Sequence, residues 1–307
     1  MSKKKILARI ISFILKKPSH WLFVNENREF TKSQYEKISG CLKLFQYGLP
    51  QAYIFGKTEF YSREFIVSED VLIPRCDSEL IVKETLHEVQ KRKNKKQIKI
   101  LELGTGSGAL IITVAKECKN LGISCVFTAT DISKDALAIA KKNVILHDVS
   151  VDLHIGDWWD ALDVTRYPFD IVFSNPPYVG AAERRFLSKN TRFEPKLALY
   201  GQYQSKSGLA SINEILSKID GKICASSGLI LIEHGFNQQR EIKSLIKEKI
   251  VRNSKGGDGD WSNLNFKRIE YTEDKNTTYN GESKKIKSEH WLSDEYMKKV
   301  FFDSFEN

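Results

Sequence analysis

The chain has 307 residues, of which 41% are hydrophobic and 11% aromatic, enough for one large domain with a sizeable core and a small second one. The 48 Lys and Arg residues against 39 Asp and Glu give a net charge of +9, which favours acidic partners such as RNA, the ribosome or an acidic protein face. Five cysteines without a Cys-x-x-Cys pair argue against a disulfide framework and a zinc cluster, and no apolar run is long enough to span a membrane. We therefore expect a cytoplasmic protein. An organellar matrix is the alternative, because no acidic residue precedes Glu26.

The first part of the chain, residues 1–50, is expected to form a small helical domain. Apolar residues recur at helical spacing from Ile6 to Ile14, and Thr31 is placed to cap a further helix. Residues 51–70 are expected to form a β-hairpin linker, since 52–67 are rich in β-branched and aromatic residues around turn points at Gly56 and Ser62.

Residues 71–275 are expected to form an α/β domain, entered through a charged helix across 91–96 and followed by a charged C-terminal tail at 276–307. Strands and helices alternate in this stretch, which is typical of a doubly wound sheet. The predicted strands are 98–103, 124–130, 151–155, 170–174, 229–233 and 265–271. The predicted helices are 107–118, 133–147, 209–219 and 238–251.

A glycine-rich loop follows the first of these strands and opens a helix. It reads Gly104, Thr105, Gly106, Ser107 and Gly108. Glycines let the backbone approach a ligand closely, and the N–H groups of the helix face it. The preceding Glu102 suits the cationic amino group of S-adenosylmethionine. The alternative is a strand-to-helix turn whose glycines serve only packing.

Two acidic residues at later strand ends fit the rest of an adenosyl group. Asp131 is placed to accept hydrogen bonds from both ribose hydroxyls, although it could instead cap the helix that starts near Ser133. Asp157 is placed to accept from the adenine amino group, and a neighbouring aromatic ring can stack on the base. Of the two tryptophans, we assign Trp158 to the cofactor, with Trp159 left as a core residue.

The strongest motif is a catalytic tetrapeptide, Asn175, Pro176, Pro177 and Tyr178, directly after an apolar strand. The prolines fix the backbone and hold the Asn175 amide and the adjacent carbonyl groups in one geometry. Those carbonyls can accept both hydrogens of a planar NH₂ group, which restores electron density at a poorly nucleophilic nitrogen. Tyr178 can pack over the planar group. The motif predicts methyl transfer to nitrogen; a Pro-Pro turn without function is the alternative.

The six histidines show no ligand spacing such as His-Glu-x-x-His, and no Gly-x-Ser-x-Gly elbow occurs. Neither metal nor hydrolase chemistry is indicated.

Together these blocks resemble the bacterial release factor glutamine methyltransferases, a protein-(glutamine) methyltransferase family, over about residues 8–271. Beyond the glycine loop and the tetrapeptide, the matching segments are 50–56, 59–61, 71–75 with Glu79, 192–195, 198–199, 207–209, 231–235 and 238–239. The chain departs from the family at 76–78, where Cys-Asp-Ser replaces the usual Pro-Glu-Thr, and at Gln202.

The resemblance implies a class I S-adenosylmethionine-dependent methyltransferase with a Rossmann-like sheet and an N-terminal substrate-recognition domain. It implies S-adenosylmethionine as cofactor, bound by residues 104–108, Asp131, Trp158 and Asn175. It also implies methylation of the glutamine in the Gly-Gly-Gln loop of class-one translation release factors. That glutamine would lie against the tetrapeptide, with Arg75 and Glu79 as further substrate-binding residues.

Three other functions stay open. One is glutamine methylation of a large-subunit ribosomal protein; another is amino-methylation of adenine or guanine in nucleic acid, which the charge suits but for which no target-recognition domain is evident. A third is a catalytically silent module that binds RNA or the ribosome. We expect a monomer that methylates protein and not nucleic acid.

Overall fold

The computed structural model describes residues 3–18, 20–25, 29–181, 183–202, 205–219 and 228–253. The expected strand 265–271, the tail 276–307 and the end of the expected α/β domain lie outside these ranges. The residues up to Leu42 and those from Lys43 belong to two separate compact units, which are taken in turn below. Across the described ranges, no helix is both long and apolar enough to cross a bilayer.

The N-terminal part is helical, as expected. Its helices are α1 (Lys3–Leu15), α2 (Trp21–Val24) and α3 (Lys32–Tyr47). Ile6, Ile10 and Ile38 supply buried apolar side chains. The predicted cap is confirmed: Thr31 Oγ1 accepts from the Gln34 backbone N–H (3.2 Å), and Gln34 Oε1 accepts from the Thr31 N–H (3.1 Å). This reciprocal pair satisfies two backbone donors at the start of α3.

The linker contains the predicted hairpin, but not over its whole length. The hairpin joins β1 (Lys57–Phe60) to β2 (Arg63–Ile66), with Tyr61 and Ser62 at positive φ in the turn. The residues before it form a short helix, α4 (Gln51–Phe55), so the extended structure expected there is wrong. Gly56 ends α4 in the left-handed conformation, which glycine adopts without strain.

Within the described residues, the α/β domain is built on a five-stranded sheet whose neighbouring strands all pair in parallel, as expected of a doubly wound sheet. Its strands are β3 (Ile98–Leu103), β4 (Cys125–Asp131), β5 (Asp152–Ile155), β6 (Ile171–Ser174) and β7 (Leu229–Ile232). Their order across the sheet is β5-β4-β3-β6-β7, so the chain steps outward in one direction from β3 to β5 and in the other from β6 to β7. This is the doubly wound arrangement predicted from the alternating pattern.

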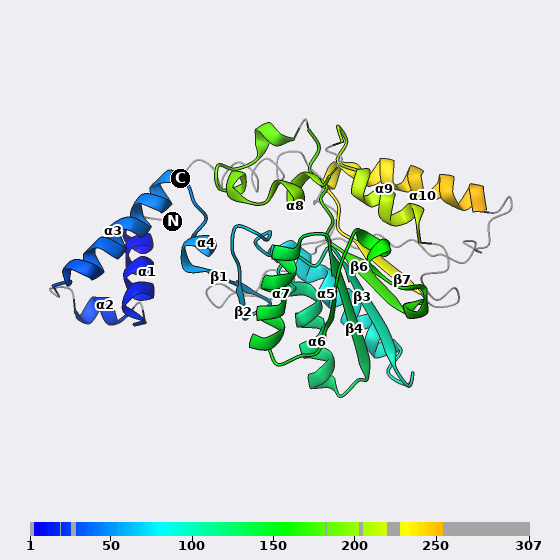
Figure 1. Ribbon diagram of the computed structural model, residues 1–307, viewed down its shortest axis with the longest axis horizontal. Coiled ribbons are helices and arrows are strands. Elements are labelled where there is room, and N and C mark those ends of the chain that lie inside the picture. Colours follow the sequence, from blue (N-terminus) through cyan, green and yellow to red (C-terminus); the bar gives the residue numbers. More distant parts are fainter. Residues whose placement is uncertain are drawn as a thin grey trace, which may run out of the picture. The chain divides into compact units, whose positions relative to one another are not determined.

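Helices cover both faces of the sheet (Figure 1). They are α5 (Glu79–Lys91), α6 (Ala109–Leu121), α7 (Lys134–Leu146), α8 (Lys196–Tyr200), α9 (Ala210–Ser217) and α10 (Gln239–Asn253). α6 packs between α5 and α7, while α9 and α10 pack together elsewhere. Right-handed crossovers in opposite directions place the two groups on opposite faces. The helix expected across 91–96 is misplaced: α5 ends at Lys91, and a turn follows.

A buried side chain, Asn143 of α7, ties the hairpin to the α/β domain. Its Oδ1 accepts from the Ile66 N–H (2.8 Å), and its Nδ2 donates to the carbonyls of Ile66 (2.9 Å) and Ser107 (2.8 Å). Asn143 is fully buried. Since a buried amide is costly unless it is hydrogen-bonded, these three contacts fix the edge of β2 and the glycine loop together.

We predict that Asn143→Leu lowers the free energy of unfolding by about 3 kcal/mol or more, because a leucine of similar size leaves three backbone groups, two of the partly buried Ile66 and one of the buried Ser107, without this partner. Urea unfolding of the purified protein measures this. Lys142→Ala, an exposed change on the same helix, is the matched control and should cost less than about 0.5 kcal/mol. Equal stability of the two variants would contradict this structural role of Asn143.

Candidate active site

The sheet reverses its strand order between β3 and β6, and the two strongest motifs meet at that point. β3 pairs with β6 in parallel, Glu102 opposite Phe173, so the glycine loop and the tetrapeptide leave the same carboxyl edge from neighbouring strands. Ser174 Oγ donates to the Leu103 carbonyl (2.7 Å) and joins the two strand ends. In open parallel sheets, ligands bind in the crevice at such a reversal.

The glycine loop is held by backbone bonds and is open on one side. The N–H groups of Gly104 and Thr105 both donate to the Thr130 carbonyl at 2.9 Å. A Cβ at Gly108 would lie 2.8 Å from Ile112 Cδ1, so this glycine serves close packing of α6. A Cβ at Gly106 would meet no described atom within 4 Å. The loop therefore combines a packing glycine with one that faces free space.

Two carboxylates shape this loop. Glu102 is buried, and its Oε2 accepts from Thr105 Oγ1 (2.6 Å) and the Ile111 N–H (3.3 Å) at the start of α6. Burial raises the pKa of Glu102 to about 8. Asp131 ends β4 and accepts from the N–H groups of Gly106 (2.8 Å) and Ser133 (2.9 Å).

The structure gives little support to the alternative that Asp131 caps α7, because the Ser133 hydroxyl caps this helix by accepting from the Ala136 N–H. Burial raises the pKa of Asp131 as well.

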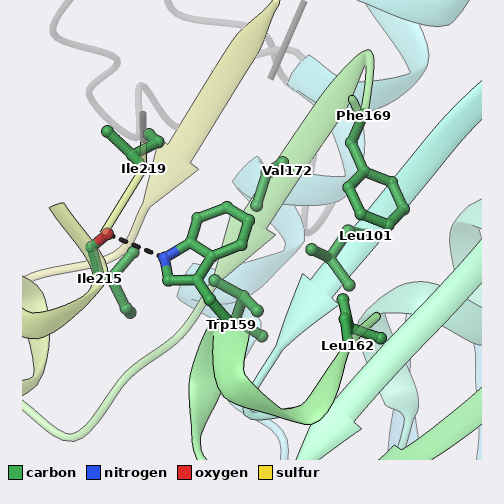
Figure 2. Close-up of a cluster of buried hydrophobic side chains, with 8 residues drawn as sticks. Leu101, Trp159, Leu162, Phe169, Val172, Ile215 and Ile219 are labelled. Atoms are coloured by element: carbon green, nitrogen blue, oxygen red, sulfur yellow. Dashed lines mark hydrogen bonds between the residues drawn. The ribbon is translucent and has the colours of Figure 1, made fainter. Parts of the chain in front are cut away.

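The two tryptophans have different surroundings. Trp159 is buried among Leu101, Val172 and Ile215, and its Nε1 donates to the Ile215 carbonyl (2.9 Å), as Figure 2 shows. Trp158 has φ +44° and stands against the glycine loop, where a Cβ at Gly104 would lie 3.1 Å from Trp158 Cζ3. Trp159 is thus the core residue, and the assignment of Trp158 to the cofactor stays a prediction. Asp157, directly before it, is partly buried, and burial raises its pKa.

A chain of hydrogen bonds holds the tetrapeptide side chains. Asn175 Nδ2 donates to Ser78 Oγ (2.9 Å), and Ser78 Oγ donates to Glu233 Oε2 (2.6 Å). The Tyr178 hydroxyl donates to the other oxygen, Glu233 Oε1 (3.1 Å). Burial and the nearby Glu233 carboxylate hold the pKa of Tyr178 above its usual range, so its hydroxyl stays protonated. The amide and the phenol are therefore tied to one carboxylate.

The tetrapeptide backbone is held separately. Gln238 is buried, and its Nε2 donates to the carbonyls of Tyr178 (2.8 Å) and Ser207 (2.7 Å), while its Oε1 accepts from the Gly235 N–H (2.8 Å). Gly208 lies so close that a Cβ there would be 2.1 Å from the Tyr178 carbonyl oxygen. Two segments distant in sequence, 207–208 and 235–238, thus converge on the end of the tetrapeptide.

The two predicted substrate-binding residues both make contacts within the chain. Arg75 Nη2 pairs with Glu194 Oε1 (2.5 Å), whose other oxygen accepts from the Ile73 N–H (3.1 Å). Glu79 Oε1 accepts from the Tyr61 N–H (3.1 Å) in the hairpin turn. Both residues order the segments around the tetrapeptide, and direct binding of substrate by them stays a prediction.

Comparison with known proteins decides the family. Residues 94–275 match the family model described as a methyltransferase domain. A release factor glutamine methyltransferase of Buchnera aphidicola subsp. Baizongia pistaciae is 34% identical over 242 residues, covering 76% of this chain and 80% of the relative. That of Francisella tularensis is 32% identical over 265 residues, covering 84% and 89%. The chain belongs to the release factor glutamine methyltransferase family.

Other relatives are longer than this chain. A bifunctional methyltransferase of Rickettsia bellii is 34% identical over 272 residues, which cover 80% of this chain and 47% of the relative. The chain therefore spans about half the length of such bifunctional relatives.

The sequence predicts that the glycine loop, the acidic residues and the tetrapeptide follow strand ends, and the structure brings them to the carboxyl edge of one sheet. This prediction missed the side chains that hold them, namely Ser78, Asn143 and Gln238. In the sequence, Ser78 stands out only as a departure from the family pattern, and Gln238 only as part of a segment that matches the family. No local pattern marks these residues, because each acts across a long sequence separation. Among the described residues, no cluster of three or more potential metal ligands occurs.

We predict that Glu102→Gln flattens the dependence of stability on pH. The pKa of Glu102 is about 8 in the folded protein against 4.5 for an ordinary glutamate, so between these values only the folded state holds the proton. The stability of the natural protein then falls as pH rises through this window, and that contribution is present in full only below pH 4.5.

Urea unfolding at pH 5 and pH 8 checks this: the natural protein should lose more stability between the two than Glu102→Gln does. The exposed Glu69→Gln is the matched control and should follow the natural protein. Equal losses in all three proteins would contradict a raised pKa at Glu102.

We predict that replacing Trp159 mainly lowers stability, whereas replacing Trp158 mainly weakens cofactor binding. Trp159→Ala should lower the free energy of unfolding by about 3–5 kcal/mol, because it empties a buried site. Trp158→Ala should cost less stability but weaken binding of S-adenosylhomocysteine by about tenfold, since stacking of a base on an aromatic ring is worth about 1–3 kcal/mol. Calorimetric titration and urea unfolding measure both. The reverse assignment would follow if Trp158→Ala cost more stability than Trp159→Ala and the folded Trp158→Ala variant bound S-adenosylhomocysteine as the natural protein does.

Proposed function

We propose that this protein transfers a methyl group from S-adenosylmethionine to the side-chain amide nitrogen of a glutamine, that of the Gly-Gly-Gln loop in class-one translation release factors. The observation that carries the proposal is Asn175, held at the carboxyl end of β6 beside the glycine loop of β3. Relatives named release factor glutamine methyltransferases, matched over most of their length, support the choice of substrate. A translation factor as substrate also supports a cytoplasmic location.

The residues at the strand reversal suit the cofactor. The glycine loop has free space at Gly106 and the ring of Trp158 against Gly104. We assign Asp131 to the ribose hydroxyls, Asp157 and Trp158 to the adenine, and Glu102 with residues 104–108 to the methionine portion. Bound S-adenosylmethionine supplies an electrophilic methyl group on a sulfonium sulfur.

The protein's part in the reaction is to prepare the amide nitrogen. Asn175 Nδ2 is used by Ser78, and among the described residues no donor reaches Asn175 Oδ1. This oxygen can accept one hydrogen of the substrate NH₂ group, and the carbonyl oxygen of Pro176 can accept the other. Both hydrogen bonds draw the lone pair back to nitrogen. Holding nitrogen in line with the methyl group can lower the barrier by roughly 7–11 kcal/mol.

The proton balance needs no strong base. The amide nitrogen gains a methyl group and loses one proton, and the N-methylated, protonated amide is acidic enough to release that proton to water. Tyr178 is not that base, because its pKa is raised and its hydroxyl donates to Glu233. We assign Tyr178 to packing over the planar amide.

We predict that the purified protein transfers labelled methyl from S-adenosylmethionine to a class-one release factor, and that the same factor with the Gly-Gly-Gln glutamine changed to alanine takes up none. Asn175→Ala should reduce transfer at least about 100-fold, because it removes an acceptor aimed at the reacting nitrogen. Scintillation counting and peptide mass spectrometry measure both.

S-adenosylhomocysteine binding by Asn175→Ala controls for folding of the crevice. Label on a ribosomal protein or on RNA, with none on the release factor, would overturn the assigned substrate and keep the reaction type. Cofactor binding with no methyl transfer to any of these substrates would favour a silent module.

A further inference from the structure

We propose that Ser78 and Glu233 are positioning residues for methyl transfer, which fix the orientation of the Asn175 amide so that its oxygen, and not its NH₂ group, faces the substrate. The inference rests on the proposed function, since it says how Asn175 is prepared for that reaction. Neither residue is assigned contact with substrate or cofactor.

An asparagine amide has two faces of opposite hydrogen-bonding character, and a half-turn about its last bond exchanges them. Only the oxygen can accept from a substrate NH₂ group. An inverted Asn175 would present donors to donors, and the site could not hold the amide nitrogen. The reaction therefore requires a partner that distinguishes the two ends of the Asn175 amide.

Ser78 is that partner, and Glu233 gives it direction. A serine hydroxyl can donate or accept, so by itself it would not choose between the amide oxygen and the NH₂ group. Here its single proton goes to Glu233 Oε2 at 2.6 Å, a length typical of an O–H donor to a carboxylate. Its lone pairs are left to accept from Asn175 Nδ2 at 2.9 Å. Glu233 thus fixes the orientation of the Ser78 hydroxyl, and this hydroxyl fixes the orientation of the Asn175 amide.

The position of Ser78 supports a dedicated role. Ser78 is fully buried and lies in the 3₁₀ turn (Cys76–Ser78) that leads directly into α5. Its backbone is already helical, and its side chain makes no cap bond to α5. Its hydroxyl reaches Glu233, at the carboxyl end of β7, across 155 residues of sequence. The hydroxyl is therefore committed to Glu233 and Asn175 and not to its own helix.

Glu233 is also confined. Its second oxygen accepts from the Tyr178 hydroxyl (3.1 Å), so both of its oxygens serve the tetrapeptide. Burial raises the pKa of Glu233, while the hydrogen bonds from Ser78 and Tyr178 lower it. Of the nearby charged groups, Asp77 raises this pKa and Arg75 lowers it. With both oxygens engaged, the carboxylate cannot rotate away without breaking a contact to Ser78 or Tyr178.

The test compares three single variants with the natural protein. Ser78→Ala removes the hydroxyl and should lower kcat for release factor methylation by about 10- to 100-fold, because a misoriented catalytic group costs about this much. KM for the release factor and affinity for S-adenosylhomocysteine should change less than about twofold, since uniform binding is untouched. Ser78→Thr keeps the hydroxyl and should retain most of kcat. Ser217→Ala, which removes a hydroxyl at the exposed end of α9, should leave all three parameters unchanged.

A second readout needs no substrate and separates this inference from the proposed function. In ¹⁵N-labelled protein, the side-chain NH₂ of Asn175 should show two dispersed proton signals, the one bonded to Ser78 exchanging slowly with solvent. Ser78→Ala should collapse them towards the values of a free amide, and Ser78→Thr should keep them. If no release factor is methylated by the natural protein, the proposed function fails, and these signals still decide whether Asn175 is held.

Three results would overturn the inference. One is Asn175 signals unchanged by Ser78→Ala. Another is a kcat of Ser78→Ala within about twofold of that of the natural protein. The third is equal loss of kcat in the alanine and threonine variants, which would assign the effect to the shape of the site and not to the hydroxyl.

Discussion

The reversal of strand order between β3 and β6 is the constraint on which the site depends. Parallel strands need helical crossovers, and right-handed crossovers that step in opposite directions leave the two central carboxyl ends uncovered by either set of helices. The glycine loop emerges from one of these ends and the tetrapeptide from the other. Neither motif alone makes a site. Their separation is set by the spacing of hydrogen-bonded neighbouring strands, which no loop movement can alter.

Acidic side chains, buried or partly buried, hold the segments that surround this edge. Glu102 anchors the glycine loop to α6, Asp131 ties that loop to the end of β4, and Glu194 and Glu233 order the segments beside the tetrapeptide. A carboxylate taken out of water is costly unless donors surround it, so each one fixes the backbone N–H or hydroxyl groups that approach it. Irregular backbone is thereby given the precision usually found in helices and strands.

The fold was predictable where its pattern is local. The β3 run from Ile98 to Leu103 and the Ser133 cap of α7 are each written in a few adjacent residues, and both appear where expected. The helix α4 was missed because Tyr53 and Ile54 favour strands by propensity, whereas packing against Val67 and Val71 and the bond from the Tyr53 hydroxyl to the Val71 carbonyl decide the structure. Tertiary contacts override weak local preference at such places.

The site follows the same division. Residues meant to meet a ligand stand in compact motifs, because one loop must present several groups to one small molecule. The residues that position them come from wherever the fold brings a suitable side chain, as Ser78 and Gln238 do from opposite ends of the domain. In the described structure, no donor reaches Asn175 Oδ1 and open space adjoins Gly106, while the neighbouring side chains are bonded within the chain. Ligand binding then requires little rearrangement of the protein, and the binding energy can go into aligning the reacting atoms.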